Sequence, residues 1–222
     1  IVMALSKFNF NSFDVTTAAS SALAFNSSAN GFSTASAGAM NLIKTQTASS
    51  SSSLSFIHGT SSVVFDNTYD VYLFKFINCH PATNDVSFTF NATTDGSNFN
   101  ITKTTTAFAA YQGEGGGGAT ITYDTSRDIA QGTGYQELMA NGGLGNGNDE
   151  STSGQLYIFA PYSTTFVKHF IATLNVYDQG DYSINPRIAG YFNTTSALTG
   201  LDFKMSSGNI DSGVIKMYGI TK

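Results

Sequence analysis

A chain of 222 residues suits one all-β domain or two small domains, and the 41% of hydrophobic residues provide enough material for a core. Only 11% of the residues are charged, so Ser, Thr, Asn and Gly must cover most of the surface, and weak charge repulsion favours association between copies. The formal net charge of −5 argues against a nucleic-acid-binding protein, because nothing here could neutralise a run of phosphates.

The first 53 residues differ in composition from the rest. They are rich in Ser, Ala and Thr and almost free of charge, and they carry scattered phenylalanines, among them Phe8, Phe10, Phe13 and Phe25. One interpretation is a flexible arm, and the other is a set of edge strands that pack on the main body. We favour an extended arm, residues 1–53, that becomes ordered in an assembly. No basic segment precedes an apolar one, so we expect no signal peptide.

Strand patterns dominate from residue 54 onward. Apolar residues alternate with polar ones in several segments, and one segment (69–77) is almost wholly apolar, as in a strand buried on both faces. Turns rich in Gly and Asn separate these segments. Residues 54–222 are therefore predicted to form a single β-sandwich or jelly roll. The strand segments are 69–77, 86–92, 154–161, 168–177, 187–193 and 213–220.

One short helix is expected around Tyr135 to Ala140, ended by Asn141-Gly142. No repeat of fixed period is present.

The chain closes on FKMSSGNIDSGVIKMYGI, which predicts a C-terminal β-hairpin. Gly208 and Asn209 would form its turn, and Gly213 would open a last strand that lies inside the sandwich. Lys216 is the only charged residue on that strand. It could limit uncontrolled edge pairing, or it could simply be a surface lysine whose stem lies over the sheet.

The sequence contains no recognisable arrangement of catalytic residues. The Gly-x-Ser-x-Gly motif of a nucleophile elbow is absent, and His58, His80 and His169 lie on separate segments without metal-binding spacing. The run GEGGGG (113–118) lacks the Lys-Ser/Thr of a phosphate-binding loop. The single cysteine, Cys79, cannot form an intramolecular disulfide, and no apolar run is long enough for a membrane helix. We therefore expect no cofactor, no metal site and no membrane partner.

Carboxylates in loops provide weaker candidates. Asp149 and Glu150 match a Ca²⁺ loop only loosely, so a solvated turn is the favoured interpretation. A pair of carboxylates for glycoside hydrolysis cannot be chosen from the sequence, because the sequence does not give the distances between the carboxylates. The acidic residues considered are Glu114, Asp124, Asp128, Glu137, Asp149 and Glu150.

Glycan-binding surfaces on β-sandwiches usually present aromatic rings, and this chain has no tryptophan. Four tyrosines in or beside loops are therefore the candidate glycan or interface contacts, with packing as the alternative role of each. Together with one loop carboxylate, the candidates are Tyr111, Tyr135, Asp149, Tyr162 and Tyr182.

The segments 72–91, 154–170 and 188–220 carry a family resemblance. The last of them ends in the pattern Ser-Ser-Gly-Asn-Ile…Ser-Gly…Ile-Lys…Tyr-Gly-Ile. These stretches resemble virion structural proteins of tailed marine phages, of cyanophage type, whose members are often labelled tail fibre or virion structural protein. The resemblance covers most of the chain and transfers no catalytic residue.

The resemblance implies a non-enzymatic subunit that is made in the host cytoplasm and located in the virion. Its partners would be copies of itself and other virion proteins, on the capsid exterior or in a fibre. No coiled-coil or repeat shaft is present, which favours a compact, decoration-type subunit. The alternative is a module of a tail fibre that binds host glycan, with the loops 113–118, 141–151 and 178–186 clustered at one end. A polysaccharide depolymerase has the least support.

Overall fold

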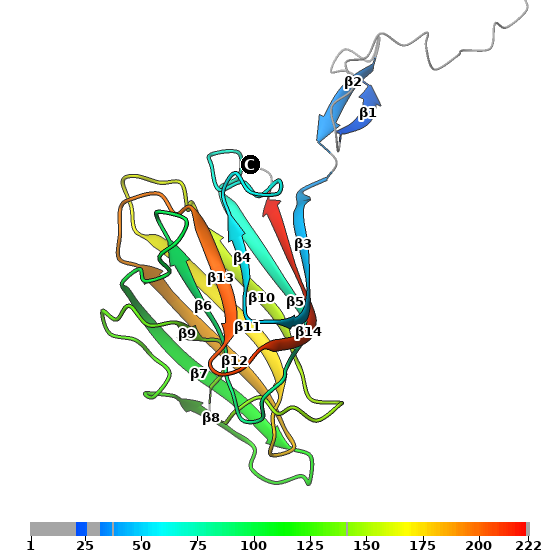
Figure 1. Ribbon diagram of the computed structural model, residues 1–222, viewed down its shortest axis with the longest axis vertical. Helices are drawn as coiled ribbons and strands as arrows, with labels where there is room; N and C mark the ends of the chain where they lie inside the picture. Colours follow the sequence, from blue (N-terminus) through cyan, green and yellow to red (C-terminus); the bar gives the residue numbers. More distant parts are fainter. Residues whose placement is uncertain (1–20, 26–31, 37, 141, 221–222) are drawn as a thin grey trace, which may run out of the picture. The chain divides into compact units, whose positions relative to one another are not determined.

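The computed structural model describes residues 21–25, 32–36, 38–140 and 142–220, with side chains from residue 38 onward (Figure 1). These residues form strands and turns and no helix, so the predicted all-β class is confirmed. The chain divides into two units at residues 41 and 42. Phe8, Phe10 and Phe13 lie outside the described residues.

The first unit contains an antiparallel pair of strands, β1 (Ser21–Phe25) and β2 (Phe32–Ser36). Two strands with one short connection bury little apolar surface by themselves. The next strand, β3, also falls within the predicted arm, but it belongs to the larger sheet of the sandwich, where it is an edge strand. For this segment the edge-strand interpretation is therefore the correct one.

The second unit is a sandwich of two antiparallel sheets. One sheet has eight strands in the order β3-β14-β5-β10-β11-β12-β7-β8, and the other has four in the order β4-β13-β6-β9. Their bounds are β3 (Met40–Ser51), β4 (Leu54–Ile57), β5 (Val71–Pro81), β6 (Phe88–Thr93), β7 (Lys103–Gly113), β8 (Thr120–Tyr123), β9 (Gln136–Glu137), β10 (Thr152–Phe159), β11 (Lys168–Tyr177), β12 (Tyr182–Phe192), β13 (Gly200–Met205) and β14 (Ile210–Ile220).

The connectivity is that of a jelly roll with two insertions. Eight strands give the spatial orders β3-β14-β5-β10 and β4-β13-β6-β9. Along the chain they alternate between the sheets, except that β6 and β9 are consecutive among them and pair within the small sheet. The remaining strands form the hairpins β7–β8 and β11–β12, which pair with each other through β12 and β7. Both hairpins widen the larger sheet and leave the jelly-roll order intact.

The core lies between the two sheets and is rich in phenylalanine. Phe203 of β13 packs against Phe74 and Phe76 of β5, with ring centroids 5.3 Å apart in each pair. Phe90 of β6 packs edge-on against Phe170 of β11 at 5.2 Å. On the large sheet, the inward side chains form a fully buried row across six strands because strand side chains alternate with period two. This row is Met217, Phe74, Leu156, Ala172, Ile188 and Ala107.

The helix predicted around Tyr135 to Ala140 is wrong. Gln136 and Glu137 form β9, which pairs with β6, and the Leu138 amide donates to the Phe88 carbonyl oxygen at 2.8 Å. The apolar residues that suggested a helical face are buried as an extended segment that closes the side of the sandwich.

The predicted C-terminal hairpin is also wrong, although its two strands exist. Strand β13 lies in the small sheet and β14 in the large one, so the turn at Gly208 and Asn209 carries the chain between sheets. Gly208 has a φ of +69°, and Gly213, with a φ of +126°, lies at a bulge where β14 shifts register against β5. The last strand does lie inside the sheet, between β3 and β5. Lys216 therefore does not guard an edge.

Candidate functional site

Three loops meet at one end of the sandwich, as expected if the chain were the glycan-binding module of the alternative interpretation. The Glu114 amide donates to the Asp181 carbonyl oxygen at 2.9 Å, and the Gln179 amide donates to the Gly143 carbonyl oxygen at 3.2 Å. These bonds join the loops 113–118, 142–151 and 178–186, and we call this region the loop end. Figure 1 shows it at the lower end, beyond β7 and β12.

Two of the predicted tyrosines, Tyr111 and Tyr182, come together at the loop end. Their rings lie 6.1 Å apart in an edge-on arrangement, and both pack against the core. A Cβ atom at Gly118 would lie 2.9 Å from the Tyr182 ring, so this glycine permits close contact between loop and ring. Both rings therefore support the loops, and neither stands free above the surface.

Asp149, the third predicted residue, lies on a polar pocket of about 490 Å³ beside the loop end. Its exposed carboxylate shares the pocket with His80 and Asp211, whose Nδ1 and Oδ2 atoms are 3.8 Å apart. His80 Nε2 lies 3.0 Å from the Gly147 carbonyl oxygen, and the Gly147 amide donates to the Glu150 carboxylate. The pocket can offer carboxylates and hydrogen bonds to a polar ligand.

The other two predicted tyrosines lie elsewhere. The Tyr135 hydroxyl donates to Asp202 at 2.9 Å on the small sheet, and Lys204 Nζ lies 4.1 Å from the Tyr135 ring centre. Burial, and then the charge of Asp202, raise the pKa of Tyr135 above its ordinary value. Tyr162 donates to Asp70 at 2.5 Å, next to the start of β5. The five candidates therefore do not form one site.

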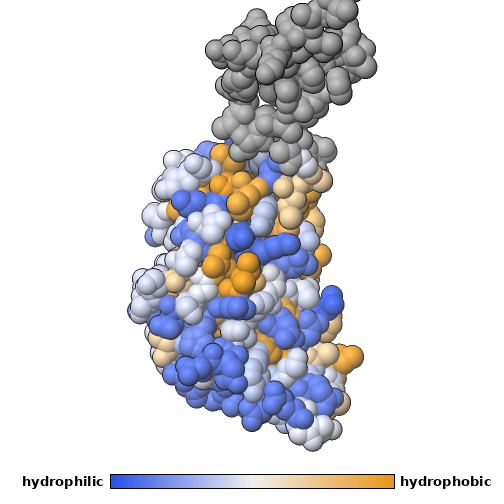
Figure 2. All heavy atoms as spheres, turned by 90° about the vertical axis from the view of Figure 1, so that its right-hand side faces the viewer, coloured by the Kyte–Doolittle hydropathy of each residue, from blue (hydrophilic) through white to orange (hydrophobic). Residues whose placement is uncertain are grey.

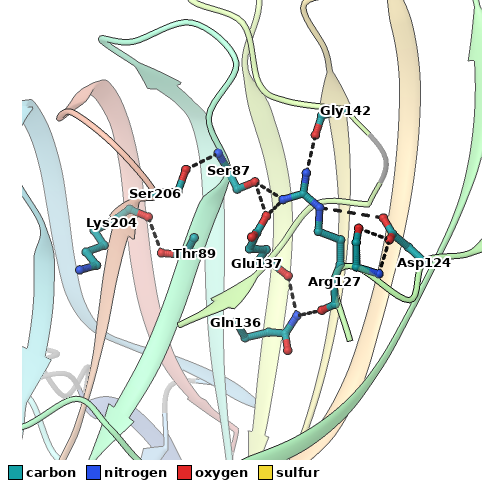
Figure 3. A network of polar contacts seen from close by, with 10 residues as sticks. Ser87, Thr89, Asp124, Arg127, Gln136, Glu137, Gly142, Lys204 and Ser206 are labelled. Carbon is teal, nitrogen blue, oxygen red and sulfur yellow. Dashed lines mark hydrogen bonds and ion pairs between the residues drawn. The ribbon is translucent and has the colours of Figure 1, made fainter. Parts of the chain in front are cut away.

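A network of polar contacts centred on Arg127 holds the segment between β8 and β9 against the small sheet (Figure 3). Its guanidinium donates to the Ser87 hydroxyl at 2.7 Å and to the Gly142 carbonyl oxygen at 3.0 Å. It also forms ion pairs with Glu137 and Asp124. Two of the carboxylates considered for hydrolysis thus share one arginine, and this arrangement stabilises the segment between β8 and β9 against the small sheet.

Two lysines are fully buried, and the predictions above missed both. Lys103 and Lys168 lie on either side of Phe192 in register, pointing into the sandwich. Lys168 Nζ donates to the carbonyl oxygens of Phe166 and Thr194 at 2.7 and 3.0 Å. Burial lowers the pKa of both amines, that of Lys103 to about 8. The signal was present in the alternation, because Lys168 is in phase with the inward residues of its strand.

The outer face of the large sheet presents an uncharged apolar row. Tyr218, Leu73, Tyr157, Ile171 and Ala189 follow one another in register across five strands. Ile171 is 48% exposed, Tyr218, Tyr157 and Ala189 are half-buried, and Leu73 is buried. Among the described residues of the second unit the strands form only the two sheets of the sandwich, so no third sheet of that unit covers this face. Figure 2, which shows the side at the right of Figure 1, has hydrophobic patches among hydrophilic side chains and a mainly hydrophilic lower end. Large apolar patches on a soluble protein mark interaction sites.

Within the described part of the chain, no three His, Cys, Asp or Glu side chains gather as metal ligands. The same residues contain no helix long and apolar enough to cross a membrane. No family model, curated protein or solved structure matches the chain.

Proposed function

We propose that the chain is a non-enzymatic structural subunit of a phage virion, on the capsid exterior or in a fibre, that associates with copies of itself and with other virion proteins. One observation carries the self-association: the apolar row on the outer face of the large sheet. Burial of such side chains against a neighbour yields about 25 cal/mol for each Å² removed from water. The virion assignment rests on the sequence resemblance, and jelly rolls are an architecture that viral capsid domains use.

The oligomeric state tests the self-association. The purified chain is expected to elute as an oligomer in size-exclusion chromatography with light scattering. Ile171→Lys, which places a charge in the middle of the apolar row, should shift it to monomer. Phe166→Lys is the matched control, because Phe166 is 71% exposed but lies in the loop between β10 and β11. A wild-type chain that stays monomeric at high concentration would refute the proposal. The position and copy number of the chain in a virion image test the assignment to the virion.

A second candidate function is binding of host glycan at the loop end. The convergence of three loops beside a polar pocket favours it. Asp149→Asn is the suitable probe, because Asp149 is exposed, whereas a change at Tyr182 would disturb the loops themselves. If glycan binding is correct, this variant loses attachment to host cells. Unchanged attachment would remove this candidate.

A further inference from the structure

Next to the apolar row lies a row that contains three cations and no carboxylate. In register across the sheet it runs Lys216, Lys75, Gln155, Thr173, Arg187, Phe108 and Tyr123. Lys216 and Lys75 are direct cross-strand partners, and like charges in that position repel each other. The outward residues of the rows on either side also include no Asp or Glu, and Asp128, which accepts a hydrogen bond from the Tyr123 hydroxyl at 2.7 Å, touches only the far end of the row. In a chain of net charge −5, this is a segregated positive surface. We call it the cationic row.

The remaining described cations are mostly engaged within the molecule. Lys103 and Lys168 are buried, Arg127 is held by carboxylates, and Lys204 lies over the Tyr135 ring. By contrast, none of the three cations of the cationic row forms an ion pair with another described residue. Arg187 is exposed, and Lys75 and Lys216 are half-buried. The three cations of the cationic row are therefore available to form ion pairs with another molecule.

The complementary surface is present on the same chain. At the loop end and the adjoining pocket, exposed carboxylates gather without lysine or arginine among the pocket residues. The exposed carboxylates are Glu114, Asp149, Asp181 and Asp211. The loop end lies beyond the ends of the strands of the large sheet, whereas the cationic row crosses the middle of the same strands. One molecule therefore presents the two charges on different surfaces.

We propose that the cationic row receives the acidic loop end of a second copy of this chain, so that copies associate head to face. This inference rests on the proposed self-association and specifies its geometry. Such a contact joins two different surfaces and is therefore heterologous, which generates rings or extended arrays rather than isolated two-fold dimers. The apolar row beside the cations would supply buried area, and the charges would set orientation and partner choice.

Charge reversal on each surface tests the contact. The face variant is Lys75→Glu with Arg187→Glu, and the end variant is Asp149→Lys with Asp211→Lys. Each variant alone is expected to be monomeric at concentrations where the wild-type chain assembles. An equimolar mixture should recover association, because the intact acidic end of the face variant meets the intact cationic row of the end variant and the swapped charges form a second complementary pair. The matched control is Lys44→Glu on the edge strand β3, which should assemble like the wild-type chain. Wild-type association should also weaken as salt is raised.

The outcomes separate this inference from the function on which it rests. If Ile171→Lys abolishes assembly but both charge-reversal variants assemble normally, the head-to-face contact is refuted and the proposed self-association stands. If the variants are monomeric and their mixture stays monomeric, the two surfaces are not partners and the inference is also refuted. If the face variant assembles normally but loses binding to a sulfated polysaccharide such as heparin, the cationic row serves an anionic polymer instead. Circular dichroism confirms that each variant is folded.

Discussion

Replacement of the buried Lys103 by methionine should make the protein more stable at neutral pH. Lys103 is fully buried, and burial lowers the pKa of its amine from 10.5 to about 8. The difference corresponds to about 3 kcal/mol of lost stability while the amine is charged in both states. Its only compensating hydrogen bond in the described structure goes to the Gly134 carbonyl oxygen, which also accepts from Asn91 Nδ2 at 3.4 Å.

The expected gain in stability is the cost of the buried charge minus the contribution of the hydrogen bond that is lost. Lys103→Met removes the cost of the buried charge and loses one hydrogen bond worth about 1–2 kcal/mol. The variant should therefore be more stable by about 1–2 kcal/mol at pH 7. Below pH 8 the amine is protonated in both the folded and unfolded wild-type protein, so the full cost is present. Between pH 8 and 10.5 the folded state loses its proton first, and wild-type stability rises relative to the variant.

Urea denaturation of both proteins at pH 7, 9 and 10.5 measures this difference. The advantage of the variant should shrink steadily above pH 8, and by pH 10.5 the lost hydrogen bond should leave the variant less stable than the wild-type protein, by roughly 1 kcal/mol. Lys216→Met is the matched control, because it makes the same substitution at a half-buried position on the outer face, away from the core. A stability difference for Lys103→Met that is constant from pH 7 to 10.5 would refute the reasoning.

Three further predictions concern the phenylalanine core, the bulge in β14 and the buried thiol of Cys79. Phe203→Ala should cost about 3–5 kcal/mol in urea denaturation, since this fully buried ring contacts five other rings, whereas Phe166→Ala should change stability by less than about 0.5 kcal/mol. Equal losses in the two variants would contradict this placement of the core. Gly213→Ala should lower the melting temperature, because its φ is +126° and the new Cβ would lie 2.7 Å from the Cys79 Cα; an unchanged melting temperature would argue against the bulge. Burial raises the pKa of the Cys79 thiol to about 12, so a thiol reagent at pH 8 should react only after unfolding, and rapid labelling of the native protein would show otherwise.

Half of the described strands could be predicted, mostly because their apolar and polar residues alternate. In β11, Phe170, Ala172, Leu174 and Val176 point inward as expected, and in β14 Ile215 and Met217 are among the buried residues. Period-two alternation reports which face is buried, and it does so from a single strand. It does not report which strand lies alongside.

This limit explains both errors in the fold. A turn such as Ser-Ser-Gly-Asn looks the same whether it joins paired strands or carries the chain across a sandwich, and only the partners of β13 and β14 distinguish the two. Likewise, the apolar residues after Tyr135 fit a helical face, but pairing of Gln136 with Phe90 and burial against the core override local propensity. The candidate site was predictable at the loop end, where turn residues mark the loops. The cationic row was not, because its members come from separate strands that meet only through register.

The position of β14 has a consequence for how the chain acquires its structure during synthesis. This strand is inserted between β3 and β5, so one of the central pairings of the large sheet involves residues 210–220. Until those residues leave the ribosome, β3 has no neighbour in its sheet and the Phe-rich core lacks Met217. Closure over such sequence separation is slow compared with local pairing. Before β14 is synthesised, the nascent chain therefore exposes an open sheet edge at β5, and its dependence on chaperones should be greatest in that period.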